Sequence, residues 1–313
     1  MENDKWYLVD NELGLFLHAA REAKGYTMEE VCKGICSLAT LFRIETGERV
    51  VDYILIEALL SRMKLLKSEY EFVLDEDDYS LYMERENIKK LIENENYEQA
   101  EAELLRYEKK NGKDSLHRQF IFYQRAVLEQ KKNEIKNDEI MTIFENAVYV
   151  TASDYKERIE QKEILSDIEL FCVIGIYNCL ESCSEREKKY RELYEYFEWC
   201  HIREKMFPIP YRSAMRYYAE CLFELGKYTE CIKICSEVLE ELYETSKLEN
   251  RNRIFELRAR ASEQLGFQTE EEKKQCIKDF LTAYYLTGFY EGKEQAEEIK
   301  RHLEEVYEWQ FIE

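Results

Sequence analysis

The side chains best suited to chemistry are ten cysteines and four histidines. Six of the cysteines stand in pairs four residues apart: Cys32/Cys36, Cys179/Cys183 and Cys231/Cys235. This spacing places both thiols of a pair on one face of a helix, where they pack as small apolar groups. Zinc sites usually contain two cysteines separated by two residues, and the sequence has no such motif. We therefore expect buried, reduced thiols and neither a metal nor another cofactor.

The sequence also lacks the motifs of common enzyme classes. It contains no GxGxxG or GxxxxGKS/T phosphate-binding pattern, no HExxH and no GxSxG. The histidines have no paired carboxylate or thiol at ligand spacing: His18, His117, His201 and His302. We predict that the protein is not an enzyme.

The elements that position these residues must be helices. Only ten glycines and two prolines occur in 313 residues, whereas sheets and barrels need turn residues about every ten positions. Hydrophobic residues make up 45% of the chain, which is enough for a large core and too many for a disordered protein. The predicted fold class is all-α.

The net charge limits the kinds of molecule that the protein can bind. The chain has 45 basic and 66 acidic residues, a formal charge of -21, and a field of that sign repels nucleic acid over most of the surface. Residues 1–74 carry net -4 and residues 75–313 net -17, so a local DNA contact fits the first region better. No leader-like start and no run of 18 apolar residues occurs. We expect a cytoplasmic protein that does not contact a membrane.

Residues 1–74 have the pattern of a helix-turn-helix domain. Four helices are predicted, at residues 13–24, 28–33, 38–45 and 52–63. Gly25 ends the first, Thr27 and Glu30 form a capping box for the second, and Ser37 caps the third. Short helices joined by tight turns at this scale are typical of helix-turn-helix domains.

Residues 75–313 contain a repeated helix pair. The clearest turn is Leu225-Gly226-Lys227-Tyr228, with apolar Cys231, Cys235 and Val238 in the helix that follows. Similar turns occur at 95–100 and 265–267, and weaker copies cover 126–147 and 168–200. This is the tetratricopeptide pattern of about 34 residues for each helix pair. We predict about five pairs stacked into a right-handed superhelix with a concave inner surface.

The segment from Gly34 to Gly47, GICSLATLFRIETG, resembles a block of bacterial xenobiotic-response-type helix-turn-helix domains, in the form found in Rgg and PlcR regulators. The run from Cys276 to Trp309 resembles the end of related regulators. Proteins of this family join the DNA-binding domain to repeats that bind a short signalling peptide. The resemblance implies a DNA-binding domain at 1–74 and a peptide-sensing and dimerisation domain at 75–313. It also implies a homodimer that binds double-stranded operator DNA.

The resemblance places the DNA contacts around the third helix. The phase of that helix turns Cys36, Leu41 and Ile44 towards the first two helices. The expected DNA-binding residues are Met28, Lys33, Ser37, Leu38, Ala39, Thr40, Phe42, Arg43 and Arg49. Arg43 matches the family's basic position, and the Ser37 amide lies at a positive helix end suited to a phosphate. Five cations are candidates either for phosphate contacts or for ordinary solvated charges: Lys33, Arg49, Arg62, Lys64 and Lys67.

Two further features follow from the same match. Arg21 and Glu45 correspond to a structural ion pair between the first and third helices of the family. Met28, Leu38 and Phe42 stand where the family commonly has polar residues, and such apolar side chains contact thymine methyls but do not read guanine. These three residues equally fit a patch covered by the repeats or by a second subunit.

The expected peptide-binding residues lie on the inner helices of the repeats: Arg85, Asn178, Arg216, Glu220, Phe223, Arg253 and Arg260. Asn178 matches a groove asparagine of the family, and an amide both donates to and accepts from a peptide backbone. The alternative for each residue is an ordinary solvated side chain.

The sequence thus favours a cytoplasmic transcription regulator that binds operator DNA and responds to a short signalling peptide. Two alternatives remain. One is a protein-interaction scaffold whose helix-turn-helix contacts protein through Leu38 and Phe42. The other is a DNA-binding protein without a peptide ligand.

Overall fold

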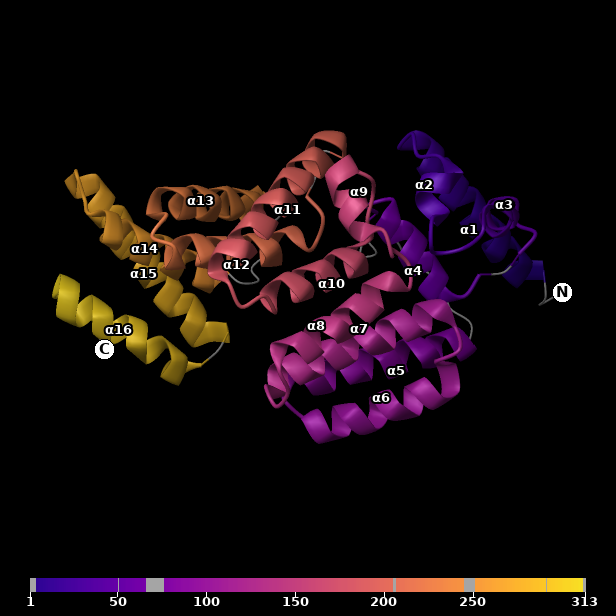
Figure 1. Ribbon diagram of the computed structural model, residues 1–313, viewed down its shortest axis with the longest axis horizontal. Coiled ribbons are helices and arrows are strands. Elements are labelled where there is room, and N and C mark those ends of the chain that lie inside the picture. The colour runs from indigo at the N-terminus through magenta and orange to yellow at the C-terminus, as the bar shows by residue number, and fades with distance from the viewer. Residues whose placement is uncertain are drawn as a thin grey trace. The chain divides into compact units, whose positions relative to one another are not determined.

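The computed structural model describes residues 4–49, 51–65, 76–204, 207–244, 251–290 and 292–311, with side chains except those of residues 4–12 and 242–244. Throughout these ranges every regular element is an α-helix (Figure 1), which confirms the all-α fold class. None of the helices in them is long and apolar enough to span a membrane. The chain forms two compact units, Met1–Leu180 with Tyr196–Pro208 and Glu181–Glu195 with Ile209–Glu313.

The first unit begins with four helices that we call the head: α1 (Asp4–Ala23), α2 (Met28–Cys32), α3 (Leu38–Glu45) and α4 (Tyr53–Arg62). The predicted capping box of Thr27 and Glu30 and the predicted cap at Ser37 are both confirmed. Gly25 follows α1 with φ of 69°, a left-handed conformation that glycine adopts without steric cost. The predicted start of the first helix at Leu13 is wrong, because the amphipathic stripe marks only part of a helix that begins at Asp4.

Six helices follow in the first unit: α5 (Glu76–Glu93), α6 (Tyr97–Asn111), α7 (Ser115–Lys132), α8 (Asn137–Tyr149), α9 (Tyr155–Gln161) and α10 (Asp167–Asn178). α5 packs on α6, α6 on α7, α7 on α8 and α8 on α10. Ala126 and Phe144, apolar residues of the weaker repeat copy predicted at 126–147, are buried between α7 and α8. α9 was not predicted, since a helix of 7 residues is too short to show a periodic stripe.

The core of the head is completed by these repeats. Leu17, Leu41 and Leu59 of the head are at most 1% exposed. They belong to the same apolar cluster as Leu116 of α7 and Ile164, which precedes α10. The head and the first repeats are therefore joined by hydrophobic packing within one compact unit.

The remaining helices are α11 (Cys183–Glu204), α12 (Tyr211–Glu224), α13 (Tyr228–Glu244), α14 (Arg251–Leu265), α15 (Glu270–Tyr290) and α16 (Lys293–Tyr307). α11 contributes residues to both units, and α12 to α16 belong to the second. Within that unit each helix from α12 to α15 packs on the next, as expected for stacked pairs. A helical repeat body is thus confirmed, while the tetratricopeptide assignment and the boundary at residue 74 stay predictions.

The expectation of buried thiols is confirmed for eight of the ten cysteines. Cys231 and Cys235 are fully buried inside α13, as their spacing on one helix face predicted. Cys36 and Cys183 are partly exposed. Burial nevertheless raises the pKa of the Cys36 thiol to about 11, so this side chain stays a neutral thiol near pH 7.

Candidate nucleic-acid interface

α3 has one buried face and one exposed face. Leu41 and Ile44 are each 1% exposed and pack in the core of the head, whereas Leu38 and Phe42 are 51% and 54% exposed. The residues predicted to point outward all do so: Leu38, Ala39, Phe42 and Arg43. The described part of the chain therefore leaves the apolar patch of Leu38 and Phe42 open, rather than covering it with the repeats.

The start of α3 is fixed by hydroxyl groups. The Ser37 Oγ accepts the Thr40 N–H at 3.1 Å and lies 2.9 Å from the Thr40 Oγ1. Arg49, exposed in the turn after α3, donates from Nη1 to the Thr40 Oγ1 at 3.3 Å. These bonds hold the helix terminus and engage both of its hydroxyl groups.

The predicted pair of Arg21 and Glu45 ties α3 to α1. Arg21 donates from Nε and Nη2 to the two Glu45 carboxylate oxygens at 2.7 and 2.9 Å. The His18 Nδ1 lies 2.9 Å from the same carboxylate. Burial alone raises the pKa of the Glu45 carboxyl, but the hydrogen bonds from Arg21 and His18 lower it below its ordinary value. The pair thus sets the orientation of α3.

Several cations that the sequence offered for phosphate contacts point inward instead. The Lys33 Nζ forms ion pairs with Glu163 at 2.6 Å and Asp154 at 3.0 Å. Arg62 is fully buried and Lys64 is 6% exposed. A phosphate role for Arg62 and Lys64 is therefore wrong, because neither side chain reaches the surface.

Met28 is half-buried and packs on the head core, so it does not extend the exposed patch of Leu38 and Phe42. Lys67 lies outside the described residues.

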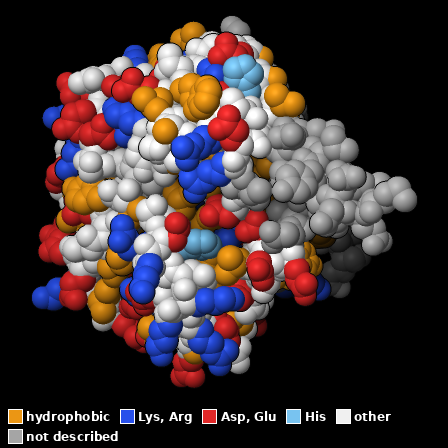
Figure 2. All heavy atoms as spheres, turned by 90° about the vertical axis from the view of Figure 1, so that its right-hand side faces the viewer, with side chains coloured by type: hydrophobic (Ala, Val, Ile, Leu, Met, Phe, Trp, Pro, Cys, Tyr) orange, Lys and Arg blue, Asp and Glu red, His pale blue; other side chains and the backbone are white. Residues whose placement is uncertain are grey.

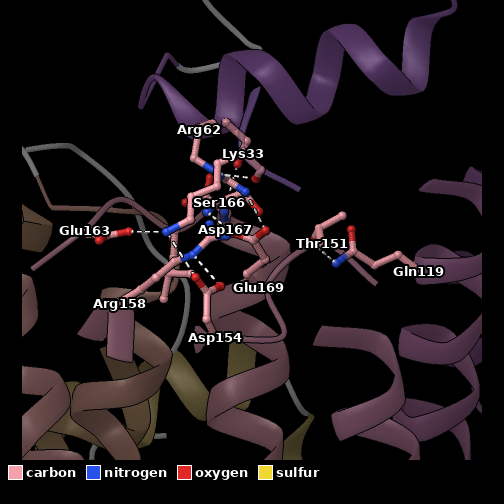
Figure 3. Close-up of polar contacts among 12 residues, drawn as sticks. Lys33, Arg62, Gln119, Thr151, Asp154, Arg158, Glu163, Ser166, Asp167 and Glu169 are labelled. Carbon is pink, nitrogen blue, oxygen red and sulfur yellow. Dashed lines mark hydrogen bonds and ion pairs between the residues drawn. The ribbon is translucent and has the colours of Figure 1, made fainter. Parts of the chain in front are cut away.

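The inward cations form a junction between the head and the repeats of the first unit, drawn in Figure 3. The Arg62 Nη2 donates to the Glu169 Oε1 at 2.6 Å, and both side chains are 0% exposed. The Arg62 Nη1 donates to the Lys33 carbonyl at 3.0 Å. The Lys64 Nζ donates to the Leu165 carbonyl at 2.6 Å. We call Lys33, Arg62 and Lys64, with their partners at 154–169, the junction.

Backbone groups complete the junction. The Glu169 Oε2 accepts the Ser166 N–H at 2.6 Å and so caps α10 while its other oxygen holds Arg62. The Asp167 N–H donates to the Ser61 Oγ at 2.8 Å. Gly34 lies against the Thr151 carbonyl so closely that a Cβ would overlap it. Sequence reasoning missed the acidic partners of the junction, since no local pattern marks them. Glu169 lies 107 residues from Arg62, and Glu163 lies 130 residues from Lys33.

A second set of contacts joins α2 and its preceding turn to the end of α11 within the first unit. The Tyr26 hydroxyl donates to the Glu204 carboxylate, and the Lys24 Nζ lies 2.9 Å from the same group. Arg203 stacks over the Tyr26 ring, 4.3 Å from its centroid, and donates to Glu30 at 3.3 Å. Figure 2 faces the side of the molecule on which α1 and α3 lie in Figure 1, and there the described residues show basic, acidic and hydrophobic side chains interspersed rather than gathered into one basic field.

The peptide-binding candidates are divided between the two units. Arg85 and Asn178 belong to the first. Arg85 is 4% exposed and donates to Glu57 of α4 at 2.9 Å, so its predicted place on a groove surface is wrong. It is buried because α5 packs on α4 through this residue. Asn178 is half-buried at the last position of α10.

The other five candidates belong to the second unit: Arg216, Glu220, Phe223, Arg253 and Arg260. On α12, Arg216 pairs with Glu220 at 2.6 Å and stacks on Tyr217, and its Nε is buried without a hydrogen-bond partner among the described residues. On α14, Arg260 contacts Glu256 at 2.8 Å and Glu298 of α16 at 3.4 Å. Partly exposed cations and an aromatic ring thus lie on α12 and α14 of this unit.

Comparison with known proteins bears on the head and on the whole fold. Residues 12–68 match the family described as a helix-turn-helix domain. PlcR of Bacillus thuringiensis, solved in complex with the peptide PapR7 and DNA, has a similar fold with 14% identity and a TM-score of 0.55, over 92% of this chain and 99% of that one. Its apo form gives 12% identity and a TM-score of 0.57, over 93% and 98% of the two chains. No curated protein sequence matches this chain.

Proposed function

We propose that this chain is a transcription regulator that acts in the cytoplasm as a homodimer. The observation that carries the proposal is the helix-turn-helix match over residues 12–68, in which α3 is braced by Arg21 and Glu45 and keeps its outward face exposed. In helix-turn-helix proteins the second helix of the motif enters the major groove and its N-terminal residues contact bases. In this chain that helix is α3, and no enzymatic role is proposed.

The contacts available to DNA are few. Arg43 and Arg49 are exposed beside the apolar patch and supply charge for phosphate groups. Lys33 is held by the junction and contributes to DNA binding only through its long-range charge. Since the whole chain carries -21, binding rests on this small set of residues. Because few phosphates are contacted, few counterions are released and the affinity falls only modestly with rising salt.

The proposed ligand of the repeat body is a short peptide. PlcR, which shares this fold, is solved with a peptide and DNA. In the second unit, Arg216, Arg253 and Arg260 can bind a carboxylate, and Phe223 can pack against an apolar side chain. Asn178, which lies in the first unit, is a separate candidate for binding peptide backbone. Arg85 does not belong to this set, because its side chain is buried.

The proposed mechanism is a change in the separation of two DNA-binding heads. A dimer binds two half-sites at a fixed spacing, so any movement of one head relative to the other alters affinity. Because the junction joins each head to its own first repeats, a rearrangement of the repeats moves the head as one body. A peptide that favours one arrangement therefore shifts DNA affinity by its preference for that arrangement.

Gel-shift selection from a library of genomic fragments tests this function. We expect the full-length chain to retain a small set of fragments at low salt, and synthetic peptides from neighbouring genes to change their affinity. Retention of no fragment would contradict the regulator. Retention without any effect of peptide would leave the DNA-binding protein that has no peptide ligand.

One observation favours a second candidate. Leu38 and Phe42 are both more than half exposed, and exposed apolar pairs commonly mark protein contacts. A protein-interaction scaffold would use this patch for a protein partner and would retain no fragment in the selection.

A further inference from the structure

The exposed face of α3 consists of two rows of side chains. Leu38 and Phe42 are four residues apart and form one row, and Ala39 and Arg43 form the next. The first row is apolar throughout, and the second ends in a guanidinium group. A base-reading helix usually presents amide or guanidinium groups at such positions, because hydrogen bonds distinguish the base edges.

The hydroxyl groups near this face are already engaged. Ser37 and Thr40 hydrogen-bond each other, and Thr40 also accepts from Arg49. The N-terminal turn of α3, which meets base edges in this motif, therefore offers mainly methyl, methylene and aromatic surface. Leu38 and Phe42 are 51% and 54% exposed, so this surface is available to a major groove.

We infer that α3 reads the C5-methyl groups of thymines through Leu38 and Phe42, with Arg43 and Arg49 on the flanking phosphates. This inference rests on the proposed DNA-binding function and specifies which bases that function selects. Thymine is the only one of the four bases that presents a methyl group in the major groove. Removing a methyl from an apolar contact weakens binding about fourfold. Two such contacts in one half-site therefore account for about 15-fold of discrimination.

The test compares thymine with deoxyuridine, which differs only by the missing methyl group. A fragment retained in the genomic selection is resynthesised with single deoxyuridines, and its affinity for the full-length chain is measured by fluorescence anisotropy. We expect about fourfold weaker binding when a contacted thymine is replaced. We expect no change when the replaced thymine lies outside the stretch of DNA that the bound protein protects from nuclease digestion. Replacing guanine with 7-deazaguanine, which removes a major-groove acceptor, should leave the affinity unchanged.

Variants assign the effect to the two side chains. Phe42→Ala and Leu38→Ala should each bind the thymine fragment about as weakly as wild type binds the corresponding deoxyuridine fragment, and should no longer distinguish that pair of fragments. Leu105→Ala is the matched control, because Leu105 is a 45% exposed leucine on α6. It should distinguish thymine from deoxyuridine as wild type does.

The outcomes separate this inference from the function on which it rests. Tight binding that is insensitive to deoxyuridine but lost with 7-deazaguanine would overturn thymine reading and leave the DNA-binding function intact. Failure to retain any fragment would overturn both. A thymine preference that persists in Phe42→Ala and in Leu38→Ala would likewise overturn the assignment to these residues.

Discussion

The inward and outward faces of the head use their cations in opposite ways. On the inward side Lys33 and Arg62 form ion pairs with acidic side chains of the repeats, and Lys64 donates a hydrogen bond to a carbonyl there. On the outward side Arg43 and Arg49 remain exposed beside an apolar patch. A basic residue near a helix-turn-helix is thus no guide to DNA contact unless its burial is known. Among the described side chains of the head, most of the positive charge positions the domain, and little is left for phosphate.

The largest expected effect comes from breaking the buried pair of the junction. Glu169→Ala leaves Arg62 as an uncompensated charge at 0% exposure, so the free energy of unfolding should fall by about 3–5 kcal/mol. Urea denaturation of the full chain measures it. The double variant Arg62→Met with Glu169→Leu removes both charges and should cost much less. A single-variant loss below about 1 kcal/mol would show that the junction does not hold the head.

The outward face depends on Arg21 and Glu45 for its orientation, and Glu45→Ala should cost about 1–4 kcal/mol. The hydrogen bonds from Arg21 and His18 hold the pKa of the Glu45 carboxyl in the folded protein below its ordinary value of 4.5. The stabilisation is therefore present above that value and is lost as pH falls through the lower folded pKa. Urea midpoints of wild type and Glu45→Gln should differ at pH 7 and converge as the pH falls below 4.5. A difference between the two urea midpoints that stays the same at every pH would contradict the ion pair of Arg21 and Glu45.

These two pairs also show how far the sequence can be used. The caps at Thr27, Ser37 and the stop at Gly25 were predictable because their hydrogen bonds and backbone angles are local. Arg21 and Glu45 were found through a family resemblance. The roles of Arg62 and Lys64 were not predictable, because their partners Glu169 and Leu165 lie more than 100 residues away.

In the repeats, the periodicity of the sequence predicted local features of the helices but not their long-range contacts. The apolar positions of α7, α8 and α13 repeat at helical spacing and were predicted as core. Arg85 follows the same spacing as a groove residue, yet it is buried against Glu57 by the packing of α5 on α4. The phase of a repeat gives the direction of a side chain but does not give the neighbour that it meets.

The second unit offers a contrast with the junction, since the ion pairs of Arg216 and Arg260 are partly exposed. Arg216→Ala should weaken peptide binding about 5- to 150-fold, because a charged hydrogen bond to the ligand is lost. Calorimetric titration with a synthetic peptide from the locus measures this change. Arg106→Ala, which removes an exposed arginine of α6, is the control and should bind peptide as wild type does. Equal affinities of the two variants would remove Arg216 from the proposed site.

The smallest effect is expected at Arg43. Arg43→Ala should weaken binding to all fragments about equally and reduce the slope of log affinity against log salt by about one charge. Anisotropy titrations over a range of salt concentrations measure that slope. A slope equal to that of Arg106→Ala would show that Arg43 does not meet a phosphate.

The central claim is that the outward face of α3 is the DNA-contact surface, and a charge placed on it tests the claim most directly. Phe42 is 54% exposed, so Phe42→Glu should shift the free energy of unfolding by no more than about 0.5 kcal/mol. Leu105→Glu makes the same change of charge on α6. The account predicts that gel-shift retention of the selected fragments is abolished in Phe42→Glu and preserved in Leu105→Glu. Retention of those fragments by Phe42→Glu with wild-type affinity would contradict it.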